Sequence, residues 1–426
     1  MKGILNNKCH KNEIFNFKIL FIFISMVVIL PPKLVQYINW TSNIRDILLL
    51  AVFSVLIFIY LALFAFRKNK KFSILLFFII LSEIVLIIST IINGVSFRYR
   101  YKLAIGIFAI VLTFELFKNL NFKNIIKALY YYFTITVFIN LITCVFFPNG
   151  IVSDTTFAVE SEQIYLLGKP NEFLPVFLVT AMIILIYSKV INKNKYSIFI
   201  LISITINVLI VDSATGKYLW LLFIVILLVV KLRILNKNIY RLISFKLLFS
   251  VIFFAFIFIV ILNSKGLFES LFVTMGRDVT LTGRTTIWNS ALELFEKSPI
   301  YGYGVYQGHG LVKVSWQSWI KGSETFITCH NTYLDFMLQG GIVYLVLNMY
   351  ILFLSDKYSK KCSDYKLLTL IRMLMFIYMI GMLVEGIGNS GYYYVAICLF
   401  YYLANMCNSV SNNKVLYEKY GERIWK

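Results

Sequence analysis

A histidine and an arginine in the second half of the chain could together transfer a group that is held on a phosphate. His330 is one of three histidines, and an unperturbed imidazole titrates at about pH 6.5, so that it can take a proton near neutral pH. Arg284 opens a helical segment, where free backbone N–H groups and a guanidinium both favour phosphate oxygens. The structural alternatives are a His330 that bonds a loop carbonyl and an Arg284 that pairs with Glu293 or Glu296.

Other cations lie where an anionic ligand would account for them. Lys217 is near the outer end of two apolar segments, and a cation inside a membrane costs about 2.5–3.5 kcal/mol. Either Asp212 or a substrate diphosphate would offset that cost. Arg98 and Arg100 lie in a short outer loop where few cations are expected, so they either contact an anionic ligand or anchor the interface. Arg277 precedes the helical segment and could assist its arginine.

Signatures of several enzyme classes are missing from the sequence. It has no P-loop, no HExxH motif, no GxSxG elbow and no D-x-D pair. An ATP-driven pump and an enzyme that uses a metal-held nucleotide sugar are therefore disfavoured, and neither metal nor cofactor is expected. Four ionisable residues lie in or beside apolar segments, where such groups usually pair. A proton relay is the alternative role for Glu83, Glu115, Arg372 and Glu385.

The composition predicts a polytopic membrane protein. Of the 426 residues, 60% are hydrophobic and only 14% are charged, against about 25% charged in soluble domains. A spanning helix needs roughly 20 apolar residues, and long apolar runs favour helices over a barrel. The predicted fold class is all-α, with about twelve transmembrane helices and one large extracytoplasmic loop. The spans are Phe15–Leu30, Ile47–Phe66, Phe72–Ile92, Leu103–Phe117, Ala128–Phe147, Phe173–Ser188, Tyr196–Val211, Ser213–Val230, Leu247–Leu262, Asn331–Leu354, Leu367–Val384 and Gly391–Met406.

The distribution of positive charge orients these spans. With both termini in the cytoplasm, most of the 41 Lys and Arg residues fall on the inner side, as the positive-inside rule requires. Arg67–Lys71 and Lys231–Lys246 are the clearest inner anchors. Contact with inner-leaflet lipids, rather than with nucleic acid, therefore accounts for most of the net charge of +21. The first apolar run lacks a small-residue cleavage site and is interpreted as an uncleaved anchor.

Residues 1–426 are predicted to form one membrane domain, whose largest outer loop is Ser264–His330. Within the loop, the apolar residues of Arg284–Lys297 recur at helical spacing, which predicts an amphipathic helix in the membrane interface. Pro299 ends this helix, and the glycines of Tyr301–Gly304 predict a tight turn. The loop contains three tryptophans, which we expect either to stack on sugars or to pack in the loop core: Trp288, Trp316 and Trp319.

Several motifs, taken in order, resemble the O-antigen polymerase and ligase superfamily of bacterial envelope enzymes. The motifs are Gly283–Trp288, Ser298–Gly304, His330–Leu334 and, as weaker matches, Gly168–Asn171 and Ser213–Lys217. Gly341 occupies the place of a family glycine that follows the His-Asn pair. Tyr344 stands where the ligase pattern has a further glycine, which disfavours the ligase reading. The strong part of the resemblance covers residues 283–345.

The resemblance implies a metal-independent glycosyltransferase of the bacterial cytoplasmic membrane, with its active site on the outer face. Donor and acceptor would be polyprenyl-pyrophosphate-linked oligosaccharides among membrane lipids, and a flippase and a chain-length regulator would be partners. His330 and Arg284 would be catalytic, as base and as diphosphate ligand. The substrate-binding candidates are Lys217, Arg98, Arg100, Arg277, Asn171, Asn331 and Tyr333.

Three functions follow from this interpretation. The first is a Wzy-type polymerase that joins repeat units into a capsule, an exopolysaccharide or an O-antigen. The second is a ligase that passes a lipid-linked glycan to another acceptor. The third is a flippase for lipid-linked oligosaccharides, although transporters often show internal repeats, and the sequence shows a large outer loop instead.

Overall fold

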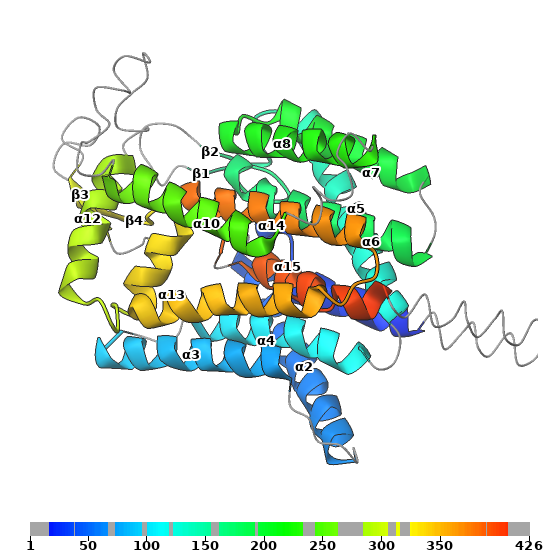
Figure 1. Ribbon diagram of the computed structural model, residues 1–426, viewed down its shortest axis with the longest axis horizontal. Helices are drawn as coiled ribbons and strands as arrows, with labels where there is room; N and C mark the ends of the chain where they lie inside the picture. Colours follow the sequence, from blue (N-terminus) through cyan, green and yellow to red (C-terminus); the bar gives the residue numbers. More distant parts are fainter. Residues whose placement is uncertain are drawn as a thin grey trace, which may run out of the picture.

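The computed structural model of the protein describes residues 17–37, 39–66, 73–95, 100–118, 122–154, 162–191, 195–232, 243–262, 284–305, 312–315, 324–388 and 390–407. Most of these residues are helical, and most of the longer helices lie roughly parallel in one bundle, to which α2 runs obliquely (Figure 1). The helices are Phe17–Ile29, η1 (Lys33–Tyr37), α2 (Asn39–Ala65), α3 (Ile74–Ile92), α4 (Arg100–Phe117), α5 (Phe122–Phe146), η3 (Pro170–Glu172), α6 (Phe173–Ile191), α7 (Lys195–Ile210), α8 (Ala214–Lys231), α10 (Phe245–Phe256), the π-helical η4 (Ile257–Leu262), α12 (Arg284–Lys297), α13 (Thr332–Ser359), α14 (Tyr365–Val384) and α15 (Gly391–Tyr401). The strands are β1 (Val152–Asp154), β2 (Glu162–Ile164), β3 (Val312–Ser315) and β4 (Glu324–Ile327).

The helices agree with the predicted membrane spans. Within the described residues, eight helical segments are long and apolar enough to cross a membrane, and three shorter apolar helices accompany them. Each of the twelve predicted spans overlaps a helical segment: the ninth covers both α10 and η4, and the fourth overlaps α4, which is not among these eleven segments. Polar side chains cap several of these helices: Ser73 accepts from a backbone N–H at the start of α3, and Asp364 does so at the start of α14. The prediction of an all-α polytopic membrane protein is confirmed.

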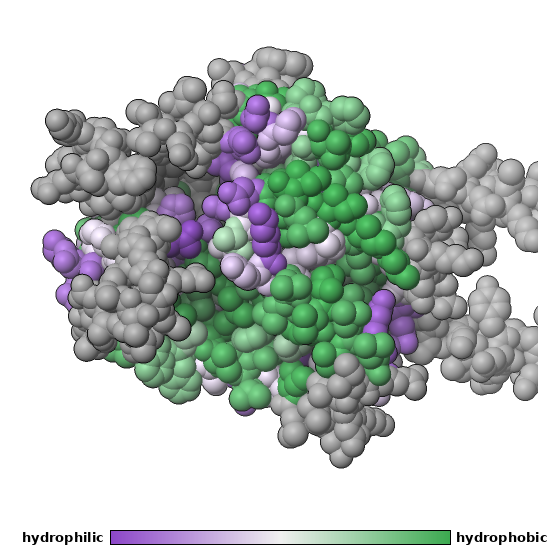
Figure 2. Space-filling view, turned by 90° about the horizontal axis from the view of Figure 1, so that it is seen from above, coloured by the Kyte–Doolittle hydropathy of each residue, from purple (hydrophilic) through white to green (hydrophobic). Residues whose placement is uncertain are grey.

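The bundle has an enclosed centre and an apolar outer surface. Helices α6, α14 and α15 are the most enclosed, whereas α2 exposes most of its apolar side chains. Figure 2 shows a broad hydrophobic region over the middle of one face, with hydrophilic residues gathered mainly toward the end at which α12 lies. Apolar side chains on the outside of a bundle suit contact with lipid chains. The helical backbone suits it too, because its polar groups are already hydrogen-bonded within each helix.

The chain connections divide between the two ends of the bundle. Because consecutive spans alternate in direction, the connection before α6, the connection between α7 and α8, the one between α10 and α13 and the one after α14 share one end. Two antiparallel hairpins, β1–β2 and β3–β4, belong to this end, and α12 lies across it (Figure 1). The sequence did not predict the hairpins, although both fall in segments that were predicted to be outer loops.

Helix α13 breaks where a loop packs against it. Gly340 and Gly341 depart from helical geometry, and Gly341 has a φ of 66°. The turn Ser298–Gly304 fills the break: N–H groups of Tyr303 and Gly304 donate to carbonyls of α13 at 2.7 and 2.8 Å, and the N–H of Ile342 donates to Pro299 at 2.8 Å. The predicted glycine turn is therefore confirmed, and its backbone replaces the helical hydrogen bonds that the break removes.

Paired charges close the opposite end of the bundle. The Nε of Arg372 in α14 donates to Asp356 of α13 at 2.8 Å. The buried Glu115 of α4 forms an ion pair with Lys118, three residues further along, and also accepts from the hydroxyl of Tyr402. Glu83 is buried within α3. The structural pairing predicted for Arg372 and Glu115 is confirmed.

Candidate active site

Arg284 is the first residue of α12, and its side chain reaches across to the end of α14. Its guanidinium donates to the carbonyl of Val384 at 2.6 Å and to Oε1 of Glu385 at 3.0 Å. The predicted alternatives, Glu293 and Glu296, lie on α12 itself, whereas the observed partner is 101 residues away in the chain. The guanidinium is 21% exposed and retains N–H groups that the two contacts do not use.

His330 is held in an unusual backbone conformation. Its φ is 47°, in the left-handed region that non-glycine residues enter only at a cost of about 1–3 kcal/mol. The residues around it hold the peptide in place: the indole of Trp288 donates to the carbonyl of Cys329 at 3.0 Å, and the N–H of Cys329 donates to Asp335 at 3.2 Å. Burial, together with the Asp335 carboxylate, raises the pKa of the Cys329 thiol well above its ordinary value. The imidazole is 43% exposed, so the backbone is fixed while the ring remains accessible.

Asn331 and Tyr333 are part of the scaffold under His330. The Asn331 side chain caps α13 by accepting from two backbone N–H groups at 3.0 and 3.1 Å, and it donates to Leu383 at 2.8 Å. The hydroxyl of Tyr333 donates to Met379 at 3.1 Å. Both side chains are buried, so they tie the start of α13 to α14. Trp288 is buried as well, which confirms that it packs in a core.

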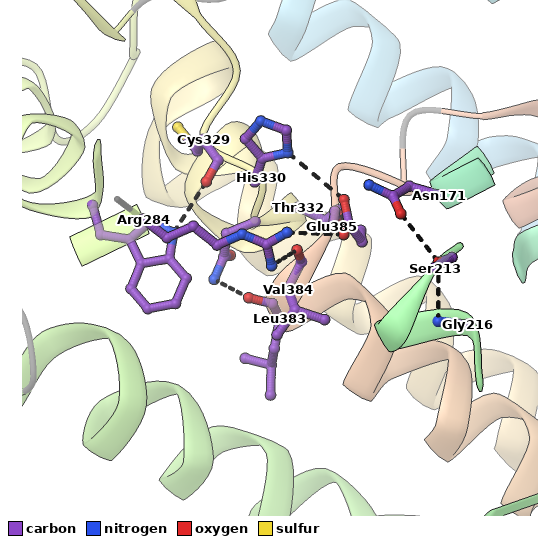
Figure 3. A network of polar contacts seen from close by, with 12 residues as sticks. Asn171, Ser213, Gly216, Arg284, Cys329, His330, Thr332, Leu383, Val384 and Glu385 are labelled. Atoms are coloured by element: carbon purple, nitrogen blue, oxygen red, sulfur yellow. Dashed lines mark hydrogen bonds and ion pairs between the residues drawn. The ribbon is translucent and has the colours of Figure 1, made fainter. Parts of the chain in front are cut away.

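Glu385 joins the two groups that the sequence predicted to be catalytic. Its Oε1 accepts from Arg284 at 3.0 Å, and its Oε2 lies 3.6 Å from Nδ1 of His330. The carboxylate is 7% exposed, and Figure 3 shows it between the guanidinium and the imidazole. Thr332 fixes its backbone by donating to the Glu385 carbonyl at 2.9 Å. From the sequence, Glu385 was only an ionisable residue beside a span, and structural pairing was the role predicted for it.

A second polar pair comes from other connections at the same end of the bundle. Ser213 caps α8 and its hydroxyl donates to the side-chain oxygen of Asn171 in η3 at 3.0 Å. Asn171 is exposed, and this pair is drawn on the other side of Glu385 from Arg284 in Figure 3. Lys217 is in the first turn of α8, where its ammonium is 3.4 Å from the exposed carboxylate of Asp212. The simpler of the two predicted partners of Lys217 is therefore present.

Some predicted residues are not placed. Arg98, Arg277 and the side chain of Arg100 lie outside the described residues, and so do Trp316 and Trp319. Their predicted contacts with a diphosphate or with sugars stay predictions.

The arrangement can bind an anion and accept a proton at neighbouring positions. The accessible edge of the Arg284 guanidinium suits the oxygens of a phosphate group. If Nδ1 of His330 carries its proton toward Glu385, the lone pair is on Nε2, where it can accept a proton from a hydroxyl. Among the described residues, no group of three or more His, Cys, Asp or Glu side chains could hold a metal ion.

Comparisons with known proteins concern only part of the chain. Residues 199–349, about a third of the chain, match the model of a family described as O-antigen ligase. The exopolysaccharide production protein ExoQ of Rhizobium meliloti (strain 1021) is 33% identical over 76 residues, which are 17% of this chain and 18% of that protein. No solved structure matches. The predicted resemblance is confirmed: the segment that contains Ser213, Arg284 and His330 carries the sequence pattern of the O-antigen ligase family.

Proposed function

We propose that the protein is a glycosyltransferase that joins polyprenyl-diphosphate-linked oligosaccharide repeat units into a cell-surface polysaccharide. The observation that carries the proposal is the meeting of Arg284, Glu385 and His330 at one end of a membrane-spanning bundle. Two of the three lie in the segment similar to O-antigen ligases. A lipid-linked donor needs an enzyme whose phosphate ligand and base lie at the edge of the apolar region, because the lipid tail stays in the membrane.

The reaction needs an anion ligand and a base. The acceptor hydroxyl oxygen forms a bond to the anomeric carbon of the donor glycan, the bond from that carbon to the diphosphate breaks, and the electron pair leaves with the diphosphate. The hydroxyl proton passes to Nε2 of His330. Arg284 stabilises the charge that develops on the diphosphate, and one such donor is worth about 3–4 kcal/mol in a site shielded from water. No step calls for a metal ion.

The remaining predicted residues have supporting roles in this proposal. Lys217, Arg98, Arg100 and Arg277 extend the positive charge around the diphosphate. Asn171 is exposed and can donate to sugar hydroxyls, since its oxygen already accepts from a serine. Asn331 and Tyr333 are buried, so they act on the substrate indirectly: they fix the start of α13 and with it the position of His330. The site lies at the outer face of the bacterial cytoplasmic membrane, with both termini inside and with a flippase and a chain-length regulator as partners.

Ligation to a different acceptor is the second candidate. The description of the matched family favours it. The sequence departs from the ligase pattern at Tyr344, which is buried with its ring 5.3 Å from that of Phe336 and its Cβ close to Gly340. The matched relative is named as an exopolysaccharide production protein. These two observations support polymerisation.

Purified protein incubated with one lipid-linked repeat unit distinguishes the candidates. We expect a ladder of products that differ by whole repeat units, together with release of polyprenyl diphosphate. A single transfer to an added foreign acceptor, without a ladder, would indicate a ligase. Glycan that remains on its lipid, combined with movement of the lipid across a vesicle membrane, would indicate a flippase and contradict the proposal.

Arg284→Lys tests the planar fork in the same reaction. An ammonium group cannot reproduce two directed contacts of a guanidinium, so we expect ladder formation to fall at least about a hundredfold, the loss typical of one missing donor. Lys297→Arg at the other end of α12 is the matched control, because residue 297 is exposed and far along the helix. Equal rates in both variants would show that Arg284 is only an anchor.

A further inference from the structure

We propose that Glu385 is a positioning residue that couples donor binding to the base. In the free protein Arg284 holds its carboxylate, and when a diphosphate occupies the guanidinium the carboxylate transfers its interaction to His330. This proposal rests on the proposed roles of Arg284 and His330, and it adds a third residue and an order of events to them.

The two contacts of the carboxylate are unequal. Oε1 is 3.0 Å from the Arg284 guanidinium, which is a charge-assisted hydrogen bond. Oε2 is 3.6 Å from Nδ1 of His330, which is too long for a hydrogen bond. The observed arrangement therefore favours the arginine, and a small rotation of the side chain toward the imidazole would reverse the preference.

Burial makes the exchange necessary. Glu385 is 7% exposed, and a buried carboxylate is costly unless a cation compensates it. A diphosphate at Arg284 competes for that compensation and adds negative charge beside the carboxylate. The imidazole of His330 is the nearest group that can gain positive charge, so binding of the anion makes its neutral form, which carries the reaction, a stronger base and raises the fraction that is protonated.

The surroundings keep the rest of the site still during such an exchange. The carbonyl of Val384 accepts from Arg284 at 2.6 Å, and the carbonyl of Glu385 accepts from Thr332 at 2.9 Å. The N–H of Gly388 donates to the same threonine oxygen at 3.0 Å. With the backbone held on both sides of the carboxylate, only the side chain of Glu385 has to move.

Two other ionisable groups belong to the residues around His330. Asp335 of α13 interacts electrostatically with His330 and accepts from the N–H of Cys329 at 3.2 Å. The Cys329 thiol is buried, and its raised pKa keeps it neutral. Asp335 is present before and after donor binding, so it does not account for a change on binding. The change on binding comes from Glu385 and the diphosphate.

The first test uses the wild-type protein and its pH dependence. The profile of kcat/KM reports the free protein, and the profile of kcat reports the donor complex. If binding makes the imidazole more basic, the acid limb of kcat lies at higher pH than the acid limb of kcat/KM. Coincident limbs would overturn the proposal, because they would show that the base does not sense the donor.

The second test removes the carboxylate charge without changing its shape. In Glu385→Gln no carboxylate competes with the diphosphate for the Arg284 guanidinium. We therefore expect a polyprenyl diphosphate to bind several-fold tighter, while kcat falls at least tenfold. Titration calorimetry in two buffers of different ionisation enthalpy should show greater proton uptake in the wild type than in Glu385→Gln, where only the diphosphate charge acts on the imidazole; equal uptake in the two proteins would refute the exchange. A purely structural role would weaken both binding and turnover, which would refute the exchange.

Two further variants guard the interpretation. Glu293→Gln removes an exposed carboxylate from α12 and should behave as the wild type. Glu385→Asp keeps the charge and should retain proton uptake; its loss in this variant would contradict the exchange. Binding and proton uptake use a polyprenyl diphosphate alone, so they can be measured even if no glycan transfer occurs. Absent transfer would refute the proposed function, whereas absent proton uptake with normal transfer would refute only the exchange.

Discussion

At the scale of single residues, Asn331 and His330 are neighbours with separable roles. Asn331 is buried and makes three hydrogen bonds that cap α13 and join it to α14. We expect Asn331→Ala to lower the free energy of unfolding by about 1–2 kcal/mol, the usual cost of a lost cap. His330→Asn should leave stability nearly unchanged, because the imidazole is partly exposed and asparagine tolerates a left-handed backbone.

Thermal unfolding in detergent, read beside the ladder reaction, checks this separation. His330→Asn is expected to keep its unfolding temperature and lose chain growth. Asn331→Ala is expected to lose both in proportion to the unfolded fraction. If His330→Asn unfolds as early as Asn331→Ala, its loss of activity has a structural cause.

Glu385 shows what the sequence could and could not predict at this scale. Residue type and spacing identified His330 and Arg284, because an imidazole in a loop and an arginine at a helix start carry a chemical signal. The ion pair between Arg284 and Glu385 spans 101 residues, so it exists only because the fold brings the first residue of α12 within reach of the end of α14. Spacing along a helix indicates only nearby partners such as Glu293. In the structure, the acidic partner of Arg284 is Glu385 instead.

At the scale of secondary structure, the break in α13 depends on Gly341. Its φ is 66°, and a Cβ built there would lie 2.0 Å from the carbonyl oxygen of Ile300. Gly341→Ala must therefore shift the turn Ser298–Gly304 or straighten the helix. We expect a loss of at least about 2 kcal/mol in the free energy of unfolding, because both the strain and the backbone clash oppose the native form.

Gly106→Ala is the matched control for this substitution. Gly106 is also in a predicted span, in α4, and a Cβ there meets nothing within 4 Å. Alanine at this position should be neutral or slightly stabilising. Thermal unfolding of the two variants decides the matter: similar midpoints would show that the turn does not depend on the break in α13.

Elements were predicted with unequal success. The helix Arg284–Lys297 has the predicted bounds, because an arginine start, a regular apolar stripe and a following proline all agree. The break in α13 was not predicted, since Asn331–Leu354 reads as one apolar run and the turn that fills the gap comes from another part of the chain. Strands of three or four residues leave no periodic signal, so the hairpins were missed.

At the scale of the whole molecule, the topology predicts which end of the bundle faces outward. In a background of Cys9→Ser, Lys297→Cys should react with a membrane-impermeant maleimide in intact cells. Lys361→Cys, at the opposite end, should react only after permeabilisation; both positions are exposed. The native Cys329 should stay unmodified near neutral pH, because it is buried and its raised pKa suppresses the thiolate. Labelling of Lys361→Cys alone in intact cells would reverse the assigned orientation.

Composition predicted the class of the molecule, a helical membrane protein, better than it predicted the residues of the site. Twelve apolar runs and the distribution of positive charge follow from the requirements of a bilayer, so they could be recognised without the fold. The meeting of α8, α12, α13 and the end of α14 at one place depends on how the bundle closes. No local pattern encodes that closure. Asn171 was therefore predicted as a binding residue and Ser213 only as part of a motif, without the hydrogen bond that joins them.

The most direct measurement follows polyprenyl diphosphate release and chain growth together, in purified wild-type protein and in His330→Asn, with one lipid-linked repeat unit as the substrate. We predict that the wild type releases one polyprenyl diphosphate for each repeat unit added. His330→Asn should bind the donor as tightly and form no ladder. A ladder produced by His330→Asn at the wild-type rate would contradict the role of the imidazole as base.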